Sequence, residues 1–517
     1  MPTRPTAAAP RAGAREWLGL SVLLLPTTVL FLSMTVLFLA TPQIAADLKP
    51  SSGQLLWIND VYGLVMAGLL VAMGTAGDRI GRRTVLLFGA AAFGAASAVA
   101  AFAPDAATLI AARAAMGVGA AAVMPSTLSL ISTMFRDGRQ RGTAIGLWAA
   151  SVSVGVAIGP LVGGMLLESF WWGSALLVGV PTMALLLIAA PILVPEHRTD
   201  DAGTLDVPSV MLSMAALLPI VYGIKEFAKH GLTATAVLTA LAGVLLAVVF
   251  VRRQLRLATP LLDVRLFAYR TFSGALAVFL LSAIALGGVY LLFTQYLQLV
   301  AGLSPLESGL WILPAALALV AVSMAAPKIA RRVRPAYVVA SGAALSVAGY
   351  LVLTQVEAAG LPLLITGFYL LYPGIAPTMA LATNLVIGSA PPDKAGAASA
   401  VNTTASDLGV SLGIAVLGSL GAAVYRSQMP DDAPATSAET LPDALAAAET
   451  LPPQQATALV DQARDAFTQG LNAAAAGAAL LTALAAVLAI TLLRHIPAAD
   501  TSAPTTEASK QEELAAA

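Results

Sequence analysis

Residues 74–83 read Gly-Thr-Ala-Gly-Asp-Arg-Ile-Gly-Arg-Arg and lie at the junction of two apolar stretches, near 55–76 and 84–103. Each stretch has about 20 residues, the length that an α-helix needs to cross the hydrocarbon core of a bilayer. The charges of Asp78, Arg79, Arg82 and Arg83 are costly in that core, so they mark the place where the chain leaves it. The segment therefore predicts a tight polar turn between two membrane-spanning helices.

The same pattern extends along the whole chain. Of its 517 residues, 58% are hydrophobic and 11% are charged, whereas a soluble protein carries about 25% charged residues. Apolar stretches of spanning length lie near 17–41, 55–76, 84–103, 107–133, 141–167, 174–195, 207–224, 234–251, 271–300, 307–327, 336–355, 361–388, 397–422 and 472–493. Backbone in hydrocarbon must satisfy its own hydrogen bonds, and these stretches lack the alternation of barrel strands. They predict an all-α integral membrane protein with 14 transmembrane helices.

The composition also excludes several classes of function. The 28 Lys and Arg residues balance 28 Asp and Glu residues, which leaves no positive excess for binding nucleic acid. Cysteine is absent, and the three histidines are His197, His230 and His495, too few for a metal cluster. We expect no metal site, no cofactor and no catalytic residues, and hence not an enzyme.

The distribution of positive charge predicts the orientation. The first apolar stretch follows three arginines but is too long for the core of a signal peptide and lacks a cleavage site, so it is expected to be a retained helix. With an even number of spans both termini lie on one side, and the loops of that side hold 22 of the 28 Lys and Arg residues. Both termini are therefore expected in the cytoplasm. The opposite side is assigned Lys49, Lys225, Lys229, Arg426 and Arg464.

The chain is predicted to divide into two six-helix halves, 17–195 and 271–495, joined by a linker, 196–270, that contributes two additional helices. An internal repeat supports this division, because Phe38, Pro50 and Trp57 return as Phe293, Pro305 and Trp311 in similar surroundings. Two repeated halves with a site between them are the arrangement of a rocking transporter.

Three further segments have a distinct composition. Residues 426–471 form a long acidic loop, expected outside the cell, in which 438–451 and 454–467 could form two short helices over the outer mouth. The two ends, 1–16 and 496–517, are rich in Ala, Pro, Thr and Ser. We expect both ends to be disordered in the cytoplasm.

Three motifs resemble those of the major facilitator superfamily. Residues 74–83 resemble its signature loop, and residues 109–117, LIAARAAMG, resemble its buried-arginine motif. Residues 155–164, GVAIGPLVGG, resemble its antiporter motif. The matching positions are Gly74, Asp78, Arg79, Gly81, Arg82 and Arg83 in the loop, Arg113 in the second motif, and Gly155, Gly159, Pro160, Gly163 and Gly164 in the third.

Shorter segments narrow the resemblance. WINDVY at 57–62, LDVRLF at 262–267 and SDLG at 406–409 are similar to the fourteen-helix drug:proton antiporters, and within them to the QacA-type multidrug exporters. The resemblance covers about residues 17–495 and implies a major facilitator fold with a 6 + 2 + 6 arrangement of helices. The glycines of the antiporter motif form a stripe on which another helix can pack closely, so we expect Gly159→Leu to block the transport motion without loss of expression.

The chain departs from the QacA-type pumps at three places that are acidic in those pumps. The first helix reads Leu32-Ser33-Met34-Thr35, residues 315–318 read AALA, and residues 402–404 read Asn-Thr-Thr. Fewer acids in the cavity favour substrates with less positive charge.

Three formal charges remain well inside spans, namely Asp60, Arg113 and Asp407. Each costs at least about 2.5–3.5 kcal/mol at the centre of a helix, so each is a functional candidate. Asp60 and Asp407 are predicted to serve proton coupling or to balance substrate charge; the alternatives are a helix cap for Asp60 and a structural hydrogen bond for Asp407. Arg113 is predicted to anchor carbonyls of the first helix, because a guanidinium does not release its proton.

Other polar and aromatic residues are expected to line a central cavity. The candidates are Ser33, Trp57, Tyr62, Tyr290, Gln295, Gln298, Trp311 and Asn402. Six more aromatic residues are expected toward it, although each could instead face lipid: Trp148, Phe293, Tyr296, Phe368, Tyr369 and Tyr372.

The resemblance implies proton-coupled efflux of lipophilic drugs or toxic compounds, monovalent cationic or neutral, by a multi-pass protein of the bacterial cytoplasmic membrane. Its expected partners are small-molecule substrates, protons and lipid, and it is expected to be a monomer. The alternative is a dedicated exporter of one natural product for self-resistance. A membrane receptor or lipid-handling enzyme is a third class, but the sequence offers no nucleophile or metal cluster in its support.

Overall fold

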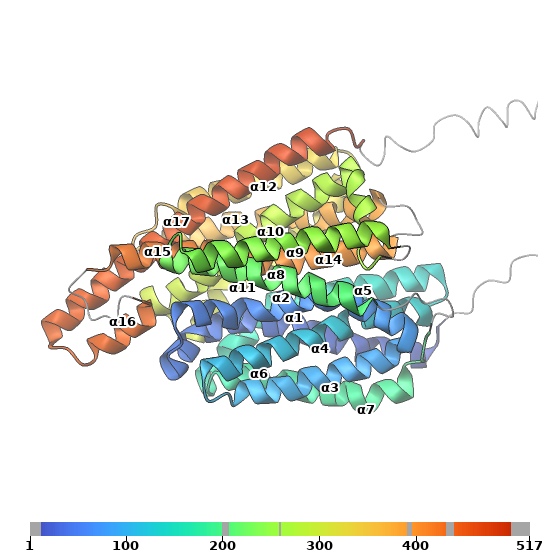
Figure 1. Ribbon diagram of the computed structural model, residues 1–517, viewed down its shortest axis with the longest axis horizontal. Helices are drawn as coiled ribbons and strands as arrows, with labels where there is room; N and C mark the ends of the chain where they lie inside the picture. Colours follow the sequence, from blue (N-terminus) through green and yellow to red (C-terminus); the bar gives the residue numbers. More distant parts are fainter. Residues whose placement is uncertain (1–11, 199–205, 258–259, 390–394, 431–438, 498–517) are drawn as a thin grey trace, which may run out of the picture.

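The computed structural model describes residues 12–198, 206–257, 260–389, 395–430 and 439–497. In these ranges, fourteen helices are long and apolar enough to cross a membrane, as the hydropathy pattern predicts. They form two bundles side by side, with one pair of helices across the junction (Figure 1).

The first bundle contains six spans. Its helices are α1 (Ala14–Leu48), α2 (Ser52–Ile80), α3 (Arg82–Ala101), α4 (Ala106–Met134), α5 (Gly138–Ser169), α6 (Gly173–Leu177) and α7 (Gly179–Leu193). The short α6 and α7 together make one span. Helix α1 begins at Ala14, so the end of the segment expected to be disordered is helical, while residues 1–11 lie outside the described part.

The linker and the second bundle follow. The linker contains α8 (Val207–His230), α9 (Ala234–Arg256) and the short η1 (Val264–Ala268). The second bundle contains α10 (Arg270–Gln295), η2 (Tyr296–Val300), α11 (Pro305–Ile329), α12 (Pro335–Leu353), α13 (Leu361–Ser389), α14 (Ala395–Gly413), η4 (Ile414–Gly418), α15 (Ser419–Gln428), α16 (Leu441–Ala448) and α17 (Pro453–Leu493). The π-helical turns η2 and η4 continue α10 and α14, so α14, η4 and α15 form one helix.

The repeat in the sequence is visible at the start of two corresponding helices. Ser51 caps the start of helix α2: its hydroxyl accepts a hydrogen bond from the backbone N–H of Gln54, and its own backbone N–H donates one to Oε1 of Gln54. Ser304 and Glu307 form the same reciprocal cap at the start of α11. Because Ser51 caps α2, Asp60 is not the cap of that helix.

The acidic loop differs from its prediction in one respect. The first predicted helix is present as α16, which packs against α17 and α1. The second, 454–467, is the beginning of α17, a single helix of 41 residues. Its Ala-rich sequence favours helix throughout, so the surface segment and the last span are continuous.

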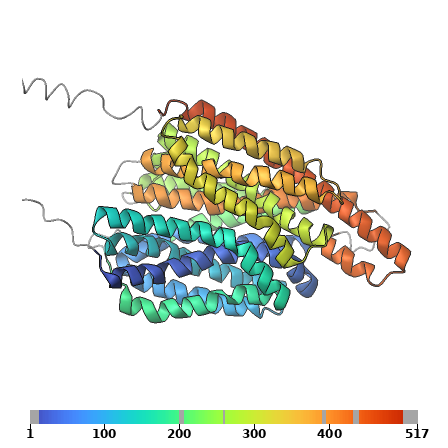
Figure 2. The ribbon, with the colours of Figure 1, turned by 180° about the vertical axis from the view of Figure 1, so that it is seen from behind.

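The two bundles meet through specific helices. Helix α5 packs on α11, α2 packs on α14, and α1 approaches α10. The linker helix α8 packs on α9 and also on α2 and α15. We call the end of the molecule with α16 the α16 end, and the end with residues 74–83 the motif end. Figure 2 shows the same two bundles from behind.

Candidate transport site

A cavity of about 420 Å³ lies between the two bundles. Its lining comes from α1, α4 and α5 of the first bundle and from α10, α11, α13 and α14 of the second. Most lining side chains are apolar or aromatic, among them Phe31, Met34, Phe38, Trp148, Tyr290 and Tyr372. The polar ones include Ser153, Ser323, Thr383, Asn402, Thr403, Ser406 and Asp407. An apolar cavity with a few polar groups is the usual form of a small-molecule site.

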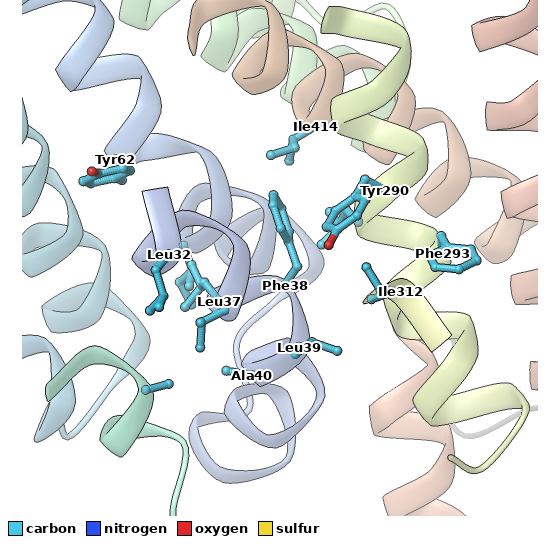
Figure 3. Close-up of a cluster of buried hydrophobic side chains, with 14 of the residues drawn as sticks. Leu32, Leu37, Phe38, Leu39, Ala40, Tyr62, Tyr290, Phe293, Ile312 and Ile414 are labelled. Atoms are coloured by element: carbon cyan, nitrogen blue, oxygen red, sulfur yellow. The ribbon is translucent and has the colours of Figure 1, made fainter. Parts of the chain in front are cut away.

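The α16 end of this cavity is closed by contacts between the bundles. The Gln298 amide donates a hydrogen bond of 2.9 Å to the carbonyl of Leu39, and the Thr294 hydroxyl donates one of 3.4 Å to that of Phe38. The Phe38 and Tyr290 rings meet edge to face with centroids 5.3 Å apart (Figure 3). Gln298 was expected to face substrate, but it is used in this closure.

Asp407 is the acidic residue of the cavity. It lies on α14, is 3% exposed, and lines the cavity. Within the described residues its Oδ2 has no hydrogen-bond partner. A buried carboxyl group without a partner is costly when ionised, so its charge depends on a proton or on a cation in the cavity.

Asp60 has a different environment. It is 1% exposed and does not line the cavity. Its Oδ2 lies 2.8 Å and its Oδ1 3.0 Å from Nζ of Lys225 on α8. The same Nζ lies 3.7 Å from the centroid of the Trp57 ring. The sequence predicts Lys225 in an outer loop, because the apolar stretch 207–224 ends just before this charge. Helix α8 in fact continues to His230, and Lys225 is buried.

Arg113 is fully buried on α4, but its partner differs from the one predicted. Its Nε donates a hydrogen bond of 3.3 Å to the carbonyl of Ile58 on α2, not to α1. Its guanidinium carbon lies 4.6 Å from the centroid of the Tyr62 ring. Arg113 therefore contacts the helix that carries Asp60, and Tyr62 faces Arg113 and not the cavity.

The structure places the remaining candidates in three environments. Tyr290 and Asn402 line the cavity, as do Trp148 and Tyr372 among the further aromatic residues. Phe293 and Phe368 stack with centroids 3.9 Å apart, and Phe368 stacks on Tyr372 at 4.9 Å, so they support the wall from behind. The others lie outside the cavity. Ser33 is buried beside the lining residue Met34, and Gln295 lines a smaller cavity at the α16 end. The Tyr296 hydroxyl donates a hydrogen bond to the carbonyl of Glu357, and the Tyr369 hydroxyl donates one to the carbonyl of Trp311, which is itself 42% exposed.

The glycine stripe of α5 packs against α1 of the same bundle. A Cβ on Gly155 would meet the carbonyl of Thr28, and one on Gly159 would meet the Thr35 side chain. Gly163 faces Val36. Bulk at Gly159 therefore disrupts the first bundle itself, which changes the expectation that only the transport motion would suffer.

Gly164 and Pro160 face the other bundle. A Cβ on Gly164 would lie 2.7 Å from the Cα of Leu306, and one on Gly309 would meet the carbonyl of Pro160. The end of the antiporter motif thus forms the close contact of α5 with α11.

The signature loop joins α2 and α3 to the end of α7. Asp78 pairs with Arg82, at 2.8 Å between Oδ1 and Nε. Gly81 has φ of 123°, which requires glycine, and a Cβ there would lie 2.7 Å from the Glu196 carboxyl group. Arg83 donates to the carbonyl of Val194 at 3.0 Å.

Glu196 completes this loop and was not found from the sequence. It accepts hydrogen bonds from the Thr84 hydroxyl at 2.8 Å and the Arg83 amide at 2.9 Å. Partial burial alone would raise the pKa of Glu196. The hydrogen bonds from Thr84 and Arg83, a third from the backbone N–H of His197, and the positive charge of Arg83 outweigh burial and lower the pKa below its ordinary value. A carboxylate at the start of α3 also suits the positive end of the helix dipole.

In the part of the chain that the structure describes, twelve spanning helices form two bundles and two more lie across their junction. This arrangement, with a cavity between the bundles and closure at one end, defines a multi-pass membrane transporter. Residues 23–414 match the model of the Major Facilitator Superfamily, and the chain belongs to that family. It is a protein of the cytoplasmic membrane with a 6 + 2 + 6 arrangement of helices.

Relatives resemble the chain over almost its whole length. It is 42% identical to the multidrug efflux pump LfrA of Mycolicibacterium smegmatis, over 94% of this chain and 98% of that protein. It is 36% identical to the methyl viologen resistance protein SmvA of Salmonella typhimurium, over 92% and 97%. The puromycin resistance protein pur8 of Streptomyces alboniger is 33% identical, over 81% and 84%.

Solved structures are similar in fold at low sequence identity. A bacterial homologue of the human lysosomal transporter Spinster, in an inward-facing and unoccupied conformation, has a TM-score of 0.67 and 17% identity. The likeness covers 94% of this chain and 99% of the other.

Proposed function

We propose that this protein exports lipophilic small molecules from the cell in exchange for protons. The observation that carries the proposal is the mostly apolar cavity between the bundles with one carboxyl group, Asp407, in its wall. An apolar wall binds lipophilic compounds without a specific set of hydrogen bonds, and this suits a broad range of substrates.

The proposed orientation places the motif end in the cytoplasm. Most Lys and Arg residues of the loops lie at this end, as cytoplasmic loops require. Lys225 no longer counts toward the opposite side, which makes the asymmetry larger. Closure at the α16 end then corresponds to a state in which substrate is taken from the inner side.

Asp407 is proposed to take the proton and to balance the charge of a cationic substrate. Four charged residues are buried in the described part of the chain: Asp60, Arg113, Lys225 and Asp407. Lys225 neutralises Asp60, and Asp407 alone among them lines the cavity. A single acid can hold either a proton or one positive charge of the substrate, so the two compete.

This competition predicts the charge of good substrates. Exchange of one proton for a monovalent cation moves no net charge, so it runs on the pH gradient alone. Exchange for a neutral compound moves one charge, which adds about 2.3 kcal/mol per 100 mV of membrane potential. We expect monovalent cations and neutral compounds to be exported better than dications.

The test is transport by the purified protein in liposomes with a pH gradient, with and without a membrane potential. Ethidium serves as the monovalent cation, methyl viologen as the dication, and a neutral lipophilic antibiotic as the third probe. We expect the membrane potential to change transport of the neutral compound but not that of ethidium. We also expect methyl viologen to be transported weakly. Methyl viologen transport equal to that of ethidium would contradict the single-acid cavity, and SmvA, at 36% identity, is the natural comparison protein.

A dedicated self-resistance exporter is the second candidate, favoured by the similarity to pur8. The closer and more complete match to LfrA favours the multidrug function. A susceptibility panel of cationic, neutral and anionic compounds in an efflux-deficient host separates them, because protection against one compound alone would support the dedicated exporter.

A further inference from the structure

The two linker helices differ in how they contact the bundles. Much of α9 faces outward, with Leu238 and Leu245 each 65% exposed. On α8, by contrast, Lys225 is only 6% exposed. A helix that merely connects two bundles has no need to bury a cation, which is costly within a membrane unless it is paired.

Lys225 is held by two residues of α2. Its Nζ contacts both carboxylate oxygens of Asp60, at 2.8 and 3.0 Å, and lies 3.7 Å from the centroid of the Trp57 ring. The face of a Trp ring attracts a cation electrostatically, and the attraction is stronger when the cation is desolvated. Lys225 thus retains one favourable contact if Asp60 loses its charge.

The pair lies where the two bundles meet. Leu64 of α2, Val221 of α8 and Ala415 of η4 form one small buried cluster. On the neighbouring α14, the Ser411 hydroxyl donates a hydrogen bond of 3.3 Å to the backbone carbonyl of Asp60. A rocking motion must change this contact of α2 with α14, so the pair occupies a moving interface.

A second small cavity adjoins Lys225 on the side of the α16 end. Its volume is about 10 Å³, and Ser52, Lys225, Ser419 and Arg426 contribute to its lining. This is room for about one water molecule. Ser419 is 3% exposed, and its hydroxyl has no hydrogen-bond partner within the described residues. Polar groups therefore continue from the Asp60–Lys225 pair toward the α16 end, away from the Asp407 cavity.

We propose that linker helix α8 takes part in proton coupling through Lys225. Its ion pair with Asp60 opens while the exchanged proton, entering from the α16 end, is held on Asp60, and it forms again when that same proton passes on toward Asp407, so that one proton serves both acids in turn. The inference rests on the proposed proton-coupled transport. In the opening step a hydronium ion at the α16 end gives one proton to the Asp60 carboxylate and leaves a water molecule. The contacts of Lys225 Nζ with Asp60 break, and Lys225 keeps its charge over Trp57. Lys225 is a positioning residue in this scheme, because it acts through Asp60.

Other charged groups surround the pair and set the background for its titration. Arg113 on α4 bonds to the carbonyl of Ile58 on the helix that carries Asp60, and its guanidinium lies over the Tyr62 ring. Asp407 lines the cavity on α14. Arg426 on α15 borders the small cavity. All of them remain in the variants below, so a change in pH dependence reports on the Asp60–Lys225 pair.

The test compares Lys225→Met, Lys225→Arg and the double variant Asp60→Asn/Lys225→Met in liposomes. Proton flux and ethidium transport are measured from pH 5.5 to 8.5 and normalised to folded protein. The matched control is Arg253→Met, which breaks another ion pair of the linker, 2.7 Å long, with Asp206.

We expect proton-linked transport by Lys225→Met to be at least about tenfold lower than that of the wild type, with a changed pH profile. Without Lys225 the buried Asp60 carboxyl group has no positive partner and stays protonated. Lys225→Arg should restore much of it, and Arg253→Met should resemble the wild type. The double variant leaves no unpaired charge, so it should fold and still lack coupling.

Wild-type transport and an unchanged pH profile in the double variant would overturn the proposal, since the pair would then be structural only. If Lys225→Met does not fold, the double variant decides the question alone. Failure of the underlying function is a separate result: the unmodified protein would move ethidium without protons.

Discussion

The two bundles meet at two related interfaces, α5 with α11 and α2 with α14. Helices α2 and α11 are equivalent in the repeat, and α5 and α14 are the fifth spans of their halves, so the two interfaces correspond. The first is made by glycine, with Gly164 against Leu306 and Gly309 against Pro160. The second also has a glycine, Gly63 against Ser411, but adds the two acids Asp60 and Asp407.

The difference indicates a division of labour between the interfaces. Backbone contact through glycine is close and independent of pH, which suits a seal. An interface with buried carboxyl groups changes its energy by several kcal/mol when a proton binds, which suits coupling. The predictions below test whether sealing and coupling can be damaged separately.

The largest effect is expected at the charged interface. Asp407→Asn should reduce proton-linked export of ethidium by at least about tenfold, because the cavity loses the carboxyl group that we propose to bind both proton and cation. Asp407→Glu, which keeps the charge, should retain a substantial part. Pyranine-loaded liposomes report the proton flux, and normal coupling in the Asn variant would remove Asp407 from the mechanism.

A smaller effect is expected at the glycine interface. Gly164→Leu inserts a side chain where a Cβ already lies 2.7 Å from Leu306, so the bundles should not close at the α16 end. Export should fall severalfold while ethidium binding in detergent persists, and dye access from the α16 end should rise.

Two further variants serve as controls for this position. Met165→Leu changes a neighbouring side chain that is 48% exposed and should have no effect. Gly159→Leu, which clashes within the first bundle, should instead lower the amount of folded protein. Equal yields for the Gly159 and Gly164 variants, with equal transport, would contradict the assignment of the two glycines to different contacts.

The smallest effect is expected for Ser411→Ala. It removes the 3.3 Å hydrogen bond to the carbonyl of Asp60, and such a bond contributes about 0.5–1.5 kcal/mol. A loss of a few degrees in melting temperature and less than about a twofold change in transport should follow. A tenfold loss of proton coupling would show that this hydroxyl carries more than packing.

The fold could be predicted from the sequence because the bilayer allows few alternatives. Apolar length gives the number of spans, and the family motifs give the arrangement. Errors occurred where this signal is weak. The 41-residue α17 begins in a polar, Ala-rich segment that hydropathy cannot distinguish from a separate surface helix.

The buried charges could be predicted from the sequence, but their partners could not. Asp60, Arg113 and Asp407 stand out because charge inside a span is costly. Lys225 did not, because it lies near the end of α8, where a loop is the ordinary explanation. The ring contacts of Trp57 and Tyr62 and the hydrogen bonds of Glu196 depend on helix rotation. They join residues that are 51 or more positions apart, and hydrophobic periodicity in apolar segments does not specify such contacts.

Helix α17 also has a practical consequence. At 1.5 Å per residue its 41 residues extend about 61 Å, whereas a bilayer with its headgroups is about 40–45 Å thick. Together with α16 it projects from the bundle as a helical hairpin (Figure 1). Most small transporters have little structure outside the membrane, so they present few epitopes to antibodies and few features for aligning particles in electron microscopy. This hairpin provides an epitope that projects from the bundle, and a Fab fragment raised against its tip would mark one end of the molecule.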